Sequence, residues 1–263
     1  EVSTQTMTSS PTDRELEELL ALATNLALDA GQIHERREMG VAETKSSITD
    51  PVTAVDKEAE EFISQEIRKA RPDDGIIGEE ETSVAGSSGL RWVIDPLDGT
   101  VNYLYQYPSY AVSIGIERDG SPLVGVVYDS ARGLLYAARA GAAATRNGKP
   151  ISATNCPNLP EALLGTGFSY QPSIRAEQAL RVAKLLPRVR DIRRSGSCAV
   201  DLCSVAAGHL DAFYETDVNW WDVAAGIQIV RSAGGIATYE PQPKRIIASG
   251  SKLWDQLNQA IFE

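Results

Sequence analysis

The stretch at residues 92–102, WVIDPLDGTVN, constrains the fold of this chain more than any other. Residues 90–94 form a short apolar run of the kind found in buried strands. Pro96 has no backbone N–H, so we expect it to end the hydrogen bonding of the strand and the chain to turn there. Gly99 and Thr100 can then open a helix. A strand, a turn and a helix are therefore predicted in immediate succession.

Two carboxylates lie within the predicted turn. Asp95 and Asp98 can point into one small volume, where like charges repel each other unless a cation lies between them. A site with only oxygen ligands favours Mg²⁺, Mn²⁺ or Ca²⁺ over zinc. The helix start at Gly99 leaves free N–H groups that suit a phosphate. The alternative interpretation is an ordinary type I turn, since Asp, Pro and Gly are all turn residues.

Composition narrows the class of partner. With 263 residues the chain can form one large domain or two closely packed halves. Its net charge of -11 argues against nucleic acid, but not against a small phosphate, because bound divalent ions reverse the local sign of charge. No apolar run approaches the ~18 residues of a membrane span and no signal peptide is evident, so we expect a soluble, cytoplasmic protein. The three cysteines have no metal-binding spacing, which suits a reducing compartment.

The N-terminal half predicts helices followed by antiparallel strands. Residues 1–12 are expected to be a disordered tail. Thr12 and Glu15 form a capping box at the start of an amphipathic helix. A second helix over 55–67 has Asp56 in its first turn, where a carboxylate is ordinarily a partner for the helix dipole. Strands are predicted at 76–77, 110–117, 123–128 and 134–138, the last three joined by tight turns.

The C-terminal half alternates strands and helices, which indicates an α/β layer. Strands are predicted at 162–164, 191–193, 212–214 and 246–248, and helices at 176–186, 198–208, 222–231 and 253–261. We place the two halves at 13–147 and 148–263, with no flexible linker between them. The halves are therefore expected to share a large interface and to form one catalytic unit.

Other carboxylates also lie at the ends of predicted strands or at the start of a predicted helix. Glu79 follows an apolar strand, as Asp95 does, so adjacent strands can bring both acids to one site; the alternative is a solvated charge run. Asp222 begins a helix and is otherwise a simple N-cap, while Glu215 closes a strand and is otherwise a surface charge. The turn before the helix at 198–208 can present backbone N–H groups to a ligand.

The residues favour metal-assisted chemistry over a protein nucleophile. Neither His34 nor His209 is placed to meet a Ser or Cys nucleophile, so a Ser-His-Asp or Cys-His mechanism is poorly supported. Neither Cys198 nor Cys203 is followed six residues later by Arg, which excludes a cysteine-phosphatase loop. Carboxylates are abundant instead, and two ions held roughly 3.5–4 Å apart by carboxylates can clamp the two oxygens of a phosphoryl displacement.

Three motifs resemble signatures of the inositol monophosphatase family: 78–80 (GEE), 92–102 and 221–226 (WDVAAG). The likeness extends from about Leu16 to the C-terminus. The resemblance implies a five-layered αβαβα sandwich of the sugar-phosphatase type, with an antiparallel sheet in the N-terminal half and a mixed α/β layer in the C-terminal half. It also implies a homodimer and Mg²⁺-dependent hydrolysis of a phosphate monoester, using two or three ions, with Mn²⁺ as a possible substitute and Li⁺ as an inhibitor.

By the same resemblance, the metal ligands can be assigned to individual residues. The first ion would be bound by Glu79, Asp95 and the Leu97 carbonyl, and the second by Asp95, Asp98 and Asp222. Bound Mg²⁺ would lower the pKa of the attacking water and neutralise charge on the leaving oxygen.

The resemblance implies further roles in catalysis and substrate binding. Glu79 would help to hold a weaker third ion and the nucleophilic water, which Thr100, backed by Asp56, would activate. Backbone N–H groups of Gly99 and Thr100 would bind the phosphate. The remaining substrate contacts would be Asp98, Asp222, Gly196, Ser197, Cys198 and Glu215.

Substrate identity is open among relatives that share these ligands. Glu215 fits a hydroxyl-rich substrate, so inositol 1-phosphate, cleaved to myo-inositol and phosphate, is favoured. Histidinol-phosphate phosphatase and fructose-1,6-bisphosphatase activities are the alternatives. Cys198 in place of a smaller residue, together with the bulk of Trp220 and Trp221, leaves the pocket shape open.

Two other hypotheses are a phosphatase with a different mechanism and a protein without catalytic activity. A haloacid-dehalogenase-type phosphatase also has an acidic motif, but its aspartates lie two apart, whereas Asp95 and Asp98 lie three apart, and it forms an aspartyl-phosphate. A regulator could keep the fold and bind protein or RNA without catalysis. The intact acidic set argues against that role, and the net charge of -11 argues against RNA.

Overall fold

The computed structural model describes residues 11–36, 43–44 and 51–263. Most of the expected tail, residues 1–10, lies outside the described part. The helices are α1 (Asp13–Glu35), α2 (Ala54–Ala70), α3 (Thr100–Leu104), α4 (Pro172–Leu185), α5 (Cys198–Ala206), α6 (Trp220–Ser232) and α7 (Trp254–Phe262), with 3₁₀ turns η1 (Leu159–Glu161) and η2 (Leu186–Arg188).

The strands form three sheets in the described residues. Strands β1 (Glu43–Thr44) and β2 (Pro51–Val52) pair with each other. The large sheet has the order β10-β9-β8-β7-β6-β5-β3-β4, made of β3 (Gly75–Gly78), β4 (Ser83–Val84), β5 (Arg91–Asp98), β6 (Ala111–Arg118), β7 (Ser121–Asp129), β8 (Leu134–Arg139), β9 (Thr145–Arg146) and β10 (Lys149–Pro150). The second sheet has the order β12-β11-β13-β15-β14, made of β11 (Leu163–Thr166), β12 (Asp191–Arg193), β13 (Ala212–Thr216), β14 (Gly235–Glu240) and β15 (Arg245–Gly250).

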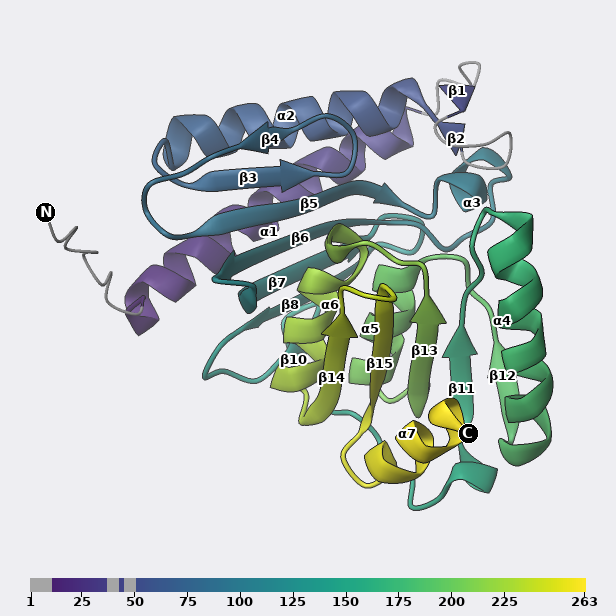
Figure 1. The fold of residues 1–263 in the computed structure, drawn as a ribbon. Helices are drawn as coiled ribbons and strands as arrows, with labels where there is room; N and C mark the ends of the chain where they lie inside the picture. The colour runs from purple at the N-terminus through teal and green to yellow at the C-terminus, as the bar shows by residue number, and fades with distance from the viewer. Residues whose placement is uncertain (1–10, 37–42, 45–50) are drawn as a thin grey trace, which may run out of the picture.

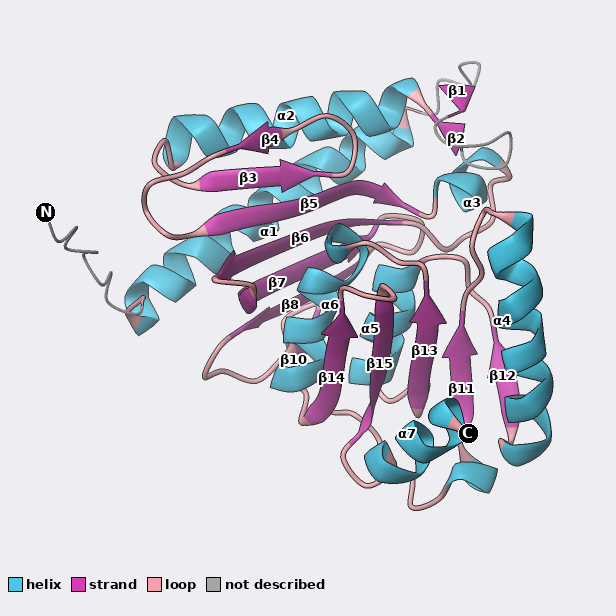
Figure 2. Ribbon diagram, viewed as in Figure 1, coloured by secondary structure: helices cyan, strands magenta, loops and turns pink. Residues whose placement is uncertain are grey.

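These elements stack in five layers (Figures 1 and 2). Helices α1 and α2 pack on one face of the large sheet, where they bury a cluster of aliphatic side chains. Helices α5 and α6 fill the space between the two sheets, and their alanine-rich surfaces make the central core. Helices α4 and α7 cover the outer face of the second sheet. The predicted αβαβα sandwich is confirmed, with a mixed C-terminal sheet and an N-terminal sheet that is antiparallel except where β3 and β5 pair in parallel.

The predicted helices and strands are present, but one expected strand end is wrong, and β14 and five strands of two residues each were not predicted. Strand β5 does not end at Pro96 but runs to Asp98. Its pairing with β6 is interrupted by a bulge between Asp95 and Asp98. Pro96 lies within this bulge, so its lack of an N–H breaks no ladder hydrogen bond and the backbone stays extended. Strand β14, over Gly235–Glu240, was not predicted, because Gly234 and Gly235 were interpreted as the end of the preceding helix. The boundary between halves at 147 and 148 stays a prediction.

Helix starts follow local hydrogen bonding. The Glu15 N–H donates to the Thr12 hydroxyl at 3.2 Å, which begins α1 where the capping pattern predicts. Thr53 and Asp56 form a complete capping box on α2. No helix in the described part of the chain combines the length and apolar character needed to cross a bilayer.

Candidate active site

The acids that end β3 and β5 lie side by side because the two strands are parallel. The register pairs Gly78 with Ile94, which places Glu79 next to Asp95. The Glu79 N–H donates to the Ile94 carbonyl at 3.1 Å and extends this pairing by one residue. Within the bulge, the Leu97 N–H donates to the Asp95 carboxylate at 3.0 Å. The prediction that adjacent strands bring Glu79 and Asp95 together is confirmed by this register.

Asp98 connects the large sheet to the start of α5. Its carboxylate accepts hydrogen bonds from the Ser197 hydroxyl and the Ala199 N–H, both at 2.6 Å. Ser197 is itself the N-cap of α5, and Gly196 before it has φ of 93°, a conformation that favours glycine. The first turn of α5 therefore does present backbone N–H groups, and Asp98 already accepts hydrogen bonds from those of Cys198 and Ala199.

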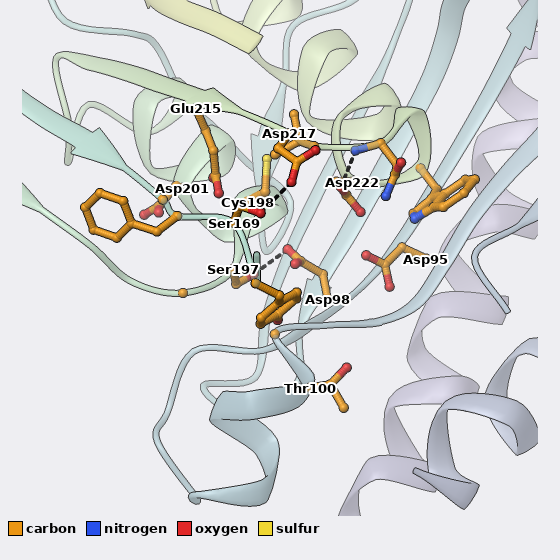
Figure 3. A pocket seen from close by; sticks show the side chains of 18 of the residues that line it. Asp95, Asp98, Thr100, Ser169, Ser197, Cys198, Asp201, Glu215, Asp217 and Asp222 are labelled. Carbon is orange, nitrogen blue, oxygen red and sulfur yellow. Dashed lines mark hydrogen bonds between the residues drawn. The ribbon is translucent and has the colours of Figure 1, made fainter. Parts of the chain in front are cut away.

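Asp222 occupies the third position of α6, not the N-cap. Asn219 is the N-cap, and its N–H donates to the Asp222 carboxylate at 2.6 Å in a reciprocal capping box. The simple N-cap interpretation of Asp222 is therefore wrong by three residues. This position points the carboxylate toward the acids of β5 (Figure 3).

Thr100 and Asp56 form a buried pair at the start of α3. The Thr100 hydroxyl lies 2.9 Å from an Asp56 oxygen and 3.0 Å from the Leu97 carbonyl. The other Asp56 oxygen accepts the Thr53 N–H at 2.8 Å and the Thr53 hydroxyl at 2.5 Å. The first-turn position of Asp56 thus serves both the helix cap and a contact with Thr100. Gly99, which precedes this helix, has φ of 94°, and a Cβ there would meet the Ser109 carbonyl.

These side chains surround one pocket of about 360 Å³ between the two sheets. All but one of the residues predicted for the site line it: Glu79, Asp95, Leu97, Asp98, Gly99, Thr100, Gly196, Ser197, Cys198, Glu215 and Asp222. The exception is Asp56, which lies behind Thr100. Figure 3 shows Asp95, Asp98 and Asp222 grouped on one side of the pocket, with Glu215 and Asp201 on the other.

Burial and mutual repulsion dominate the electrostatics of the acid group. Burial, followed by the charges of Glu79, Asp98 and Asp222, raises the pKa of Asp95 well above its ordinary range. Burial and the neighbouring acids likewise raise the pKa of Asp222. For Asp98, burial raises the pKa to about 6, although hydrogen bonds from Ser197 and Ala199 oppose the shift. Buried carboxylates that repel one another in this way are stabilised by a divalent cation.

The donor set fits a hard divalent cation, although the side chains are not arranged around one point. In the described residues, no group of three or more His, Cys, Asp or Glu side chains stands in a position to hold a metal ion. The chemistry nevertheless matches Mg²⁺, because the four acids and the Leu97 carbonyl supply oxygen only.

The opposite side of the pocket carries a second acidic group. Burial, followed by repulsion from Asp201, raises the pKa of Glu215 to about 8, although Arg194 opposes the shift. Burial also raises the pKa of Asp201 to about 7. For Cys198, burial raises the pKa well above the ordinary range of a thiol, so this residue is not a thiolate nucleophile at neutral pH.

The sequence did not identify the segment between β11 and α4 as part of the pocket. Residues 167–171 line it, together with Asp201, Asp217 and Lys244. The Ser169 hydroxyl donates to Asp217 at 2.5 Å, which ties this segment to the turn after β13. The alternation of strands and helices in this half was a partial signal, because ligands bind at the carboxyl ends of parallel strands, and the structure shows that β11 and β13 are such neighbours.

The layered fold, with a carboxylate-lined pocket between two sheets, defines the class of inositol and sugar phosphate phosphatases. The chain belongs to the inositol monophosphatase family, whose model matches residues 15–259. Membership indicates a phosphatase, and members of the family generally use metal ions.

Similar proteins support this assignment at the level of sequence and structure. The chain is 41% identical over 243 residues to the inositol-1-monophosphatase of Mycobacterium bovis, covering 84% of each chain. It is 45% identical over 230 residues to a protein named Nus factor SuhB from Xylella fastidiosa, covering 82% of this chain and 83% of the other. The structure of Mycobacterium tuberculosis SuhB matches with a TM-score of 0.83 and 38% identity, covering 95% of this chain and 98% of that one.

Proposed function

We propose that this protein is a Mg²⁺-dependent inositol-1-monophosphatase. The observation that carries the proposal is the gathering of Glu79, Asp95, Asp98 and Asp222 around one pocket that also contains the start of α3. Glu79, Asp95 and the Leu97 carbonyl would hold one ion, and Asp95, Asp98 and Asp222 a second. A weaker third ion would contact Glu79. Bound Mg²⁺ would supply charge neutralisation and a water of lowered pKa.

The protein groups around that position have separate tasks. The N–H groups of Gly99 and Thr100 would bind the phosphate oxygens at the positive end of α3. The Thr100 hydroxyl would orient the attacking water and accept its proton while passing its own to Asp56, 2.9 Å away. Burial raises the pKa of Asp56, which makes proton uptake by this carboxylate easier than it is for an exposed aspartate. No protein nucleophile is required.

The far side of the pocket favours a hydroxyl-rich alcohol. Gly196, Ser197, Cys198 and Glu215 would meet the polyol, and a Glu215 with a pKa of about 8 is protonated at neutral pH and can both donate and accept hydrogen bonds. These features support a hydroxyl-rich ester over histidinol phosphate, and among such esters we propose inositol 1-phosphate. A cytoplasmic homodimer is part of the same proposal, and light scattering of the purified protein tests its mass.

The deciding experiment compares inositol 1-phosphate, histidinol phosphate and fructose 1,6-bisphosphate as substrates in the presence of Mg²⁺. We expect the highest kcat/KM for inositol 1-phosphate, complete loss with EDTA, recovery with Mg²⁺ or Mn²⁺, and inhibition by Li⁺. A higher kcat/KM for either other ester would replace the substrate assignment. Mass spectrometry during turnover tests the mechanism, because phosphorylated Asp95 or Asp98 would indicate a covalent intermediate instead of direct attack by water.

A second candidate function is a regulatory role through a protein partner, favoured by the similarity to a protein named Nus factor SuhB. The test compares wild-type protein with an inactive Asp95→Asn variant in binding to the candidate partner. Binding that persists in the inactive variant, together with no turnover of any phosphate ester by the wild type, would favour regulation over catalysis.

A further inference from the structure

The carboxylate of Glu60 binds three consecutive backbone N–H groups just after Glu79. Glu60 lies on α2 and is 3% exposed. One of its oxygens accepts the Glu80 N–H at 2.8 Å, and the other accepts the N–H groups of Glu81 and Thr82 at 2.9 and 2.8 Å. Hydrogen bonds to a carboxylate are stronger than those between neutral groups. Both oxygens of Glu60 are therefore committed to the segment that follows β3.

The backbone of Glu79 is also fixed on the side that faces β5. The Glu79 N–H donates to the Ile94 carbonyl of β5 at 3.1 Å, so the residue lies between the sheet and the Glu60 carboxylate. Gly78 makes room for this arrangement, because a Cβ there would overlap the Glu60 carboxylate. The hydroxyls of Ser64 and Thr82 add a hydrogen bond of 3.2 Å between α2 and the same segment.

Glu60 and Asp56 share one face of α2, because residues four apart in a helix are neighbours. Asp56 contacts Thr100 at 2.9 Å, and Glu60 holds the backbone that carries Glu79. One face of one helix therefore fixes two sides of the pocket. Burial of both acids against the large sheet gives these contacts little freedom to shift.

We propose that Glu60 is a positioning residue, which holds Glu79 where its carboxylate can share a divalent cation with Asp95. The inference rests on the metal-dependent function proposed above. Residues that orient a metal ligand change metal affinity by about 10–100-fold when they are replaced. Glutamine at position 60 keeps the shape of the side chain but turns one acceptor oxygen into an NH₂ donor, so at least one of the three backbone N–H groups loses its partner.

The test is calorimetric titration of the purified protein with Mg²⁺, without substrate, for the wild type, Glu60→Gln and the control Asp74→Asn. Asp74 is equally buried, at 3% exposure, but it binds the Trp92 indole N–H and the Ser88 hydroxyl at the opposite ends of β3 and β5. We expect the Mg²⁺ Kd to rise about tenfold in Glu60→Gln and to stay within about twofold in Asp74→Asn, although both variants lower Tm. In activity assays, raising Mg²⁺ should restore much of the kcat of Glu60→Gln.

A Glu60→Gln variant with a lowered Tm and a wild-type Mg²⁺ Kd would overturn the inference and leave Glu60 with a structural role only. If that variant does not fold, Glu60→Asp replaces it, because aspartate keeps the charge on a shorter side chain. Its Mg²⁺ Kd should rise by less than that expected for Glu60→Gln. An unchanged Kd in Glu60→Asp would also overturn the inference. Wild-type protein that binds no Mg²⁺ would refute the proposed function itself, and the inference would fail with it. If the wild type binds Mg²⁺ and Glu60→Gln binds it with the same Kd, the inference is refuted and the proposed function stands.

Discussion

At Asp95, burial and three neighbouring carboxylates act in the same direction. Each raises the pKa, and none of these influences stabilises the charged form. A carboxylate in this position lowers the stability of the folded protein when it is ionised without a cation, and a bound cation compensates that cost. The same residue would serve both principal ions in the proposed site, so its removal should have the largest effect of any single substitution there.

Asp95→Asn should lower phosphate release by ~100-fold or more at fixed Mg²⁺, because both ions lose a ligand. The same change should raise Tm of the metal-free protein, since it removes repulsion. An inorganic phosphate assay and thermal denaturation measure the two effects. Asp119→Asn, at an exposed residue in the turn after β6, is the matched control. Near-normal turnover by Asp95→Asn would contradict the ligand assignment.

Glu215→Gln should change substrate preference more than it changes kcat. Because the pKa of Glu215 is about 8, its side chain is neutral at lower pH and becomes charged as the pH rises above that value. The KM of the wild type for inositol 1-phosphate should therefore change through this pH range, whereas the KM of the variant should not. Steady-state kinetics across the range provide the measurement, and parallel KM profiles would show that Glu215 does not meet the substrate.

At the scale of elements, the pocket is built where strands end and helices begin. Asp95 lies at the bulge of β5, and Asp222 lies in the capping box at the start of α6. The segment between β11 and α4 closes the far side next to Glu215. Gly167 in this segment lies so close to the Glu215 carboxylate that a Cβ would overlap it.

Gly167→Ala should displace either Glu215 or the segment around residue 167, and so raise KM several-fold while kcat changes less. The three atoms nearest to a Cβ at position 167 all belong to Glu215, which is why the effect should fall on the alcohol. Kinetics with inositol 1-phosphate and with a small phosphate ester lacking ring hydroxyls provide the measurement. A uniform loss with both esters would indicate general misfolding of the site instead.

Element types were predictable where the pattern of apolar residues was strong. The strands and helices of both halves follow from alternation and helical spacing, and the start of α1 follows from Thr12 and Glu15. The continuation of β5 past Pro96 was not predictable from local chemistry, because it depends on β6, with which pairing resumes at Asp98 after the bulge. The strand β14 was missed because Gly234 and Gly235 were interpreted as the end of the preceding helix.

At the scale of the whole molecule, metal binding should couple to stability through the acid group. Mg²⁺ at about 100 times its Kd adds about 2.7 kcal/mol to the free energy of unfolding. Protons compete for the same oxygens, and the pKa of Asp98 is about 6, so the Mg²⁺-induced rise in Tm should be large near neutral pH and should shrink as the pH falls below that value. Thermal denaturation with Mg²⁺ or with NaCl of matched ionic strength tests this. Equal shifts with both salts would argue against a specific site.

His34 should make stability depend on pH in the acidic range. Its ring lies 3.0 Å from the Pro96 carbonyl and 2.7 Å from the Ser130 hydroxyl, joining α1 to the bulge of β5. Burial lowers its pKa from 6.5 to about 4, so between these values the unfolded chain binds a proton that the folded chain does not. This contribution to stability is complete above pH 6.5 and falls by up to about 3 kcal/mol as the pH decreases to about 4.

The measurement is the difference in unfolding free energy between wild type and His34→Gln, by urea denaturation across that pH range. The difference should shrink as the pH falls, because the variant has no imidazole to protonate. Contributions from the buried carboxylates are present in both proteins and cancel. Parallel pH profiles for the two proteins would show that the folded protein binds the proton as readily as the unfolded chain.

The linear chain determined which acids, glycines and capping residues are available, because turn and helix-start chemistry is local. It placed Asp95, Asp98, Gly99 and Thr100 together, since they are neighbours in sequence. Only the tertiary structure decided that Glu79 and Asp222 join them, that Glu60 and Asp56 support the pocket wall from one helix face, and that the 167–171 segment closes the pocket. The physical reason is that these contacts depend on strand pairing and on helices packed between sheets, which bring together residues far apart in the chain.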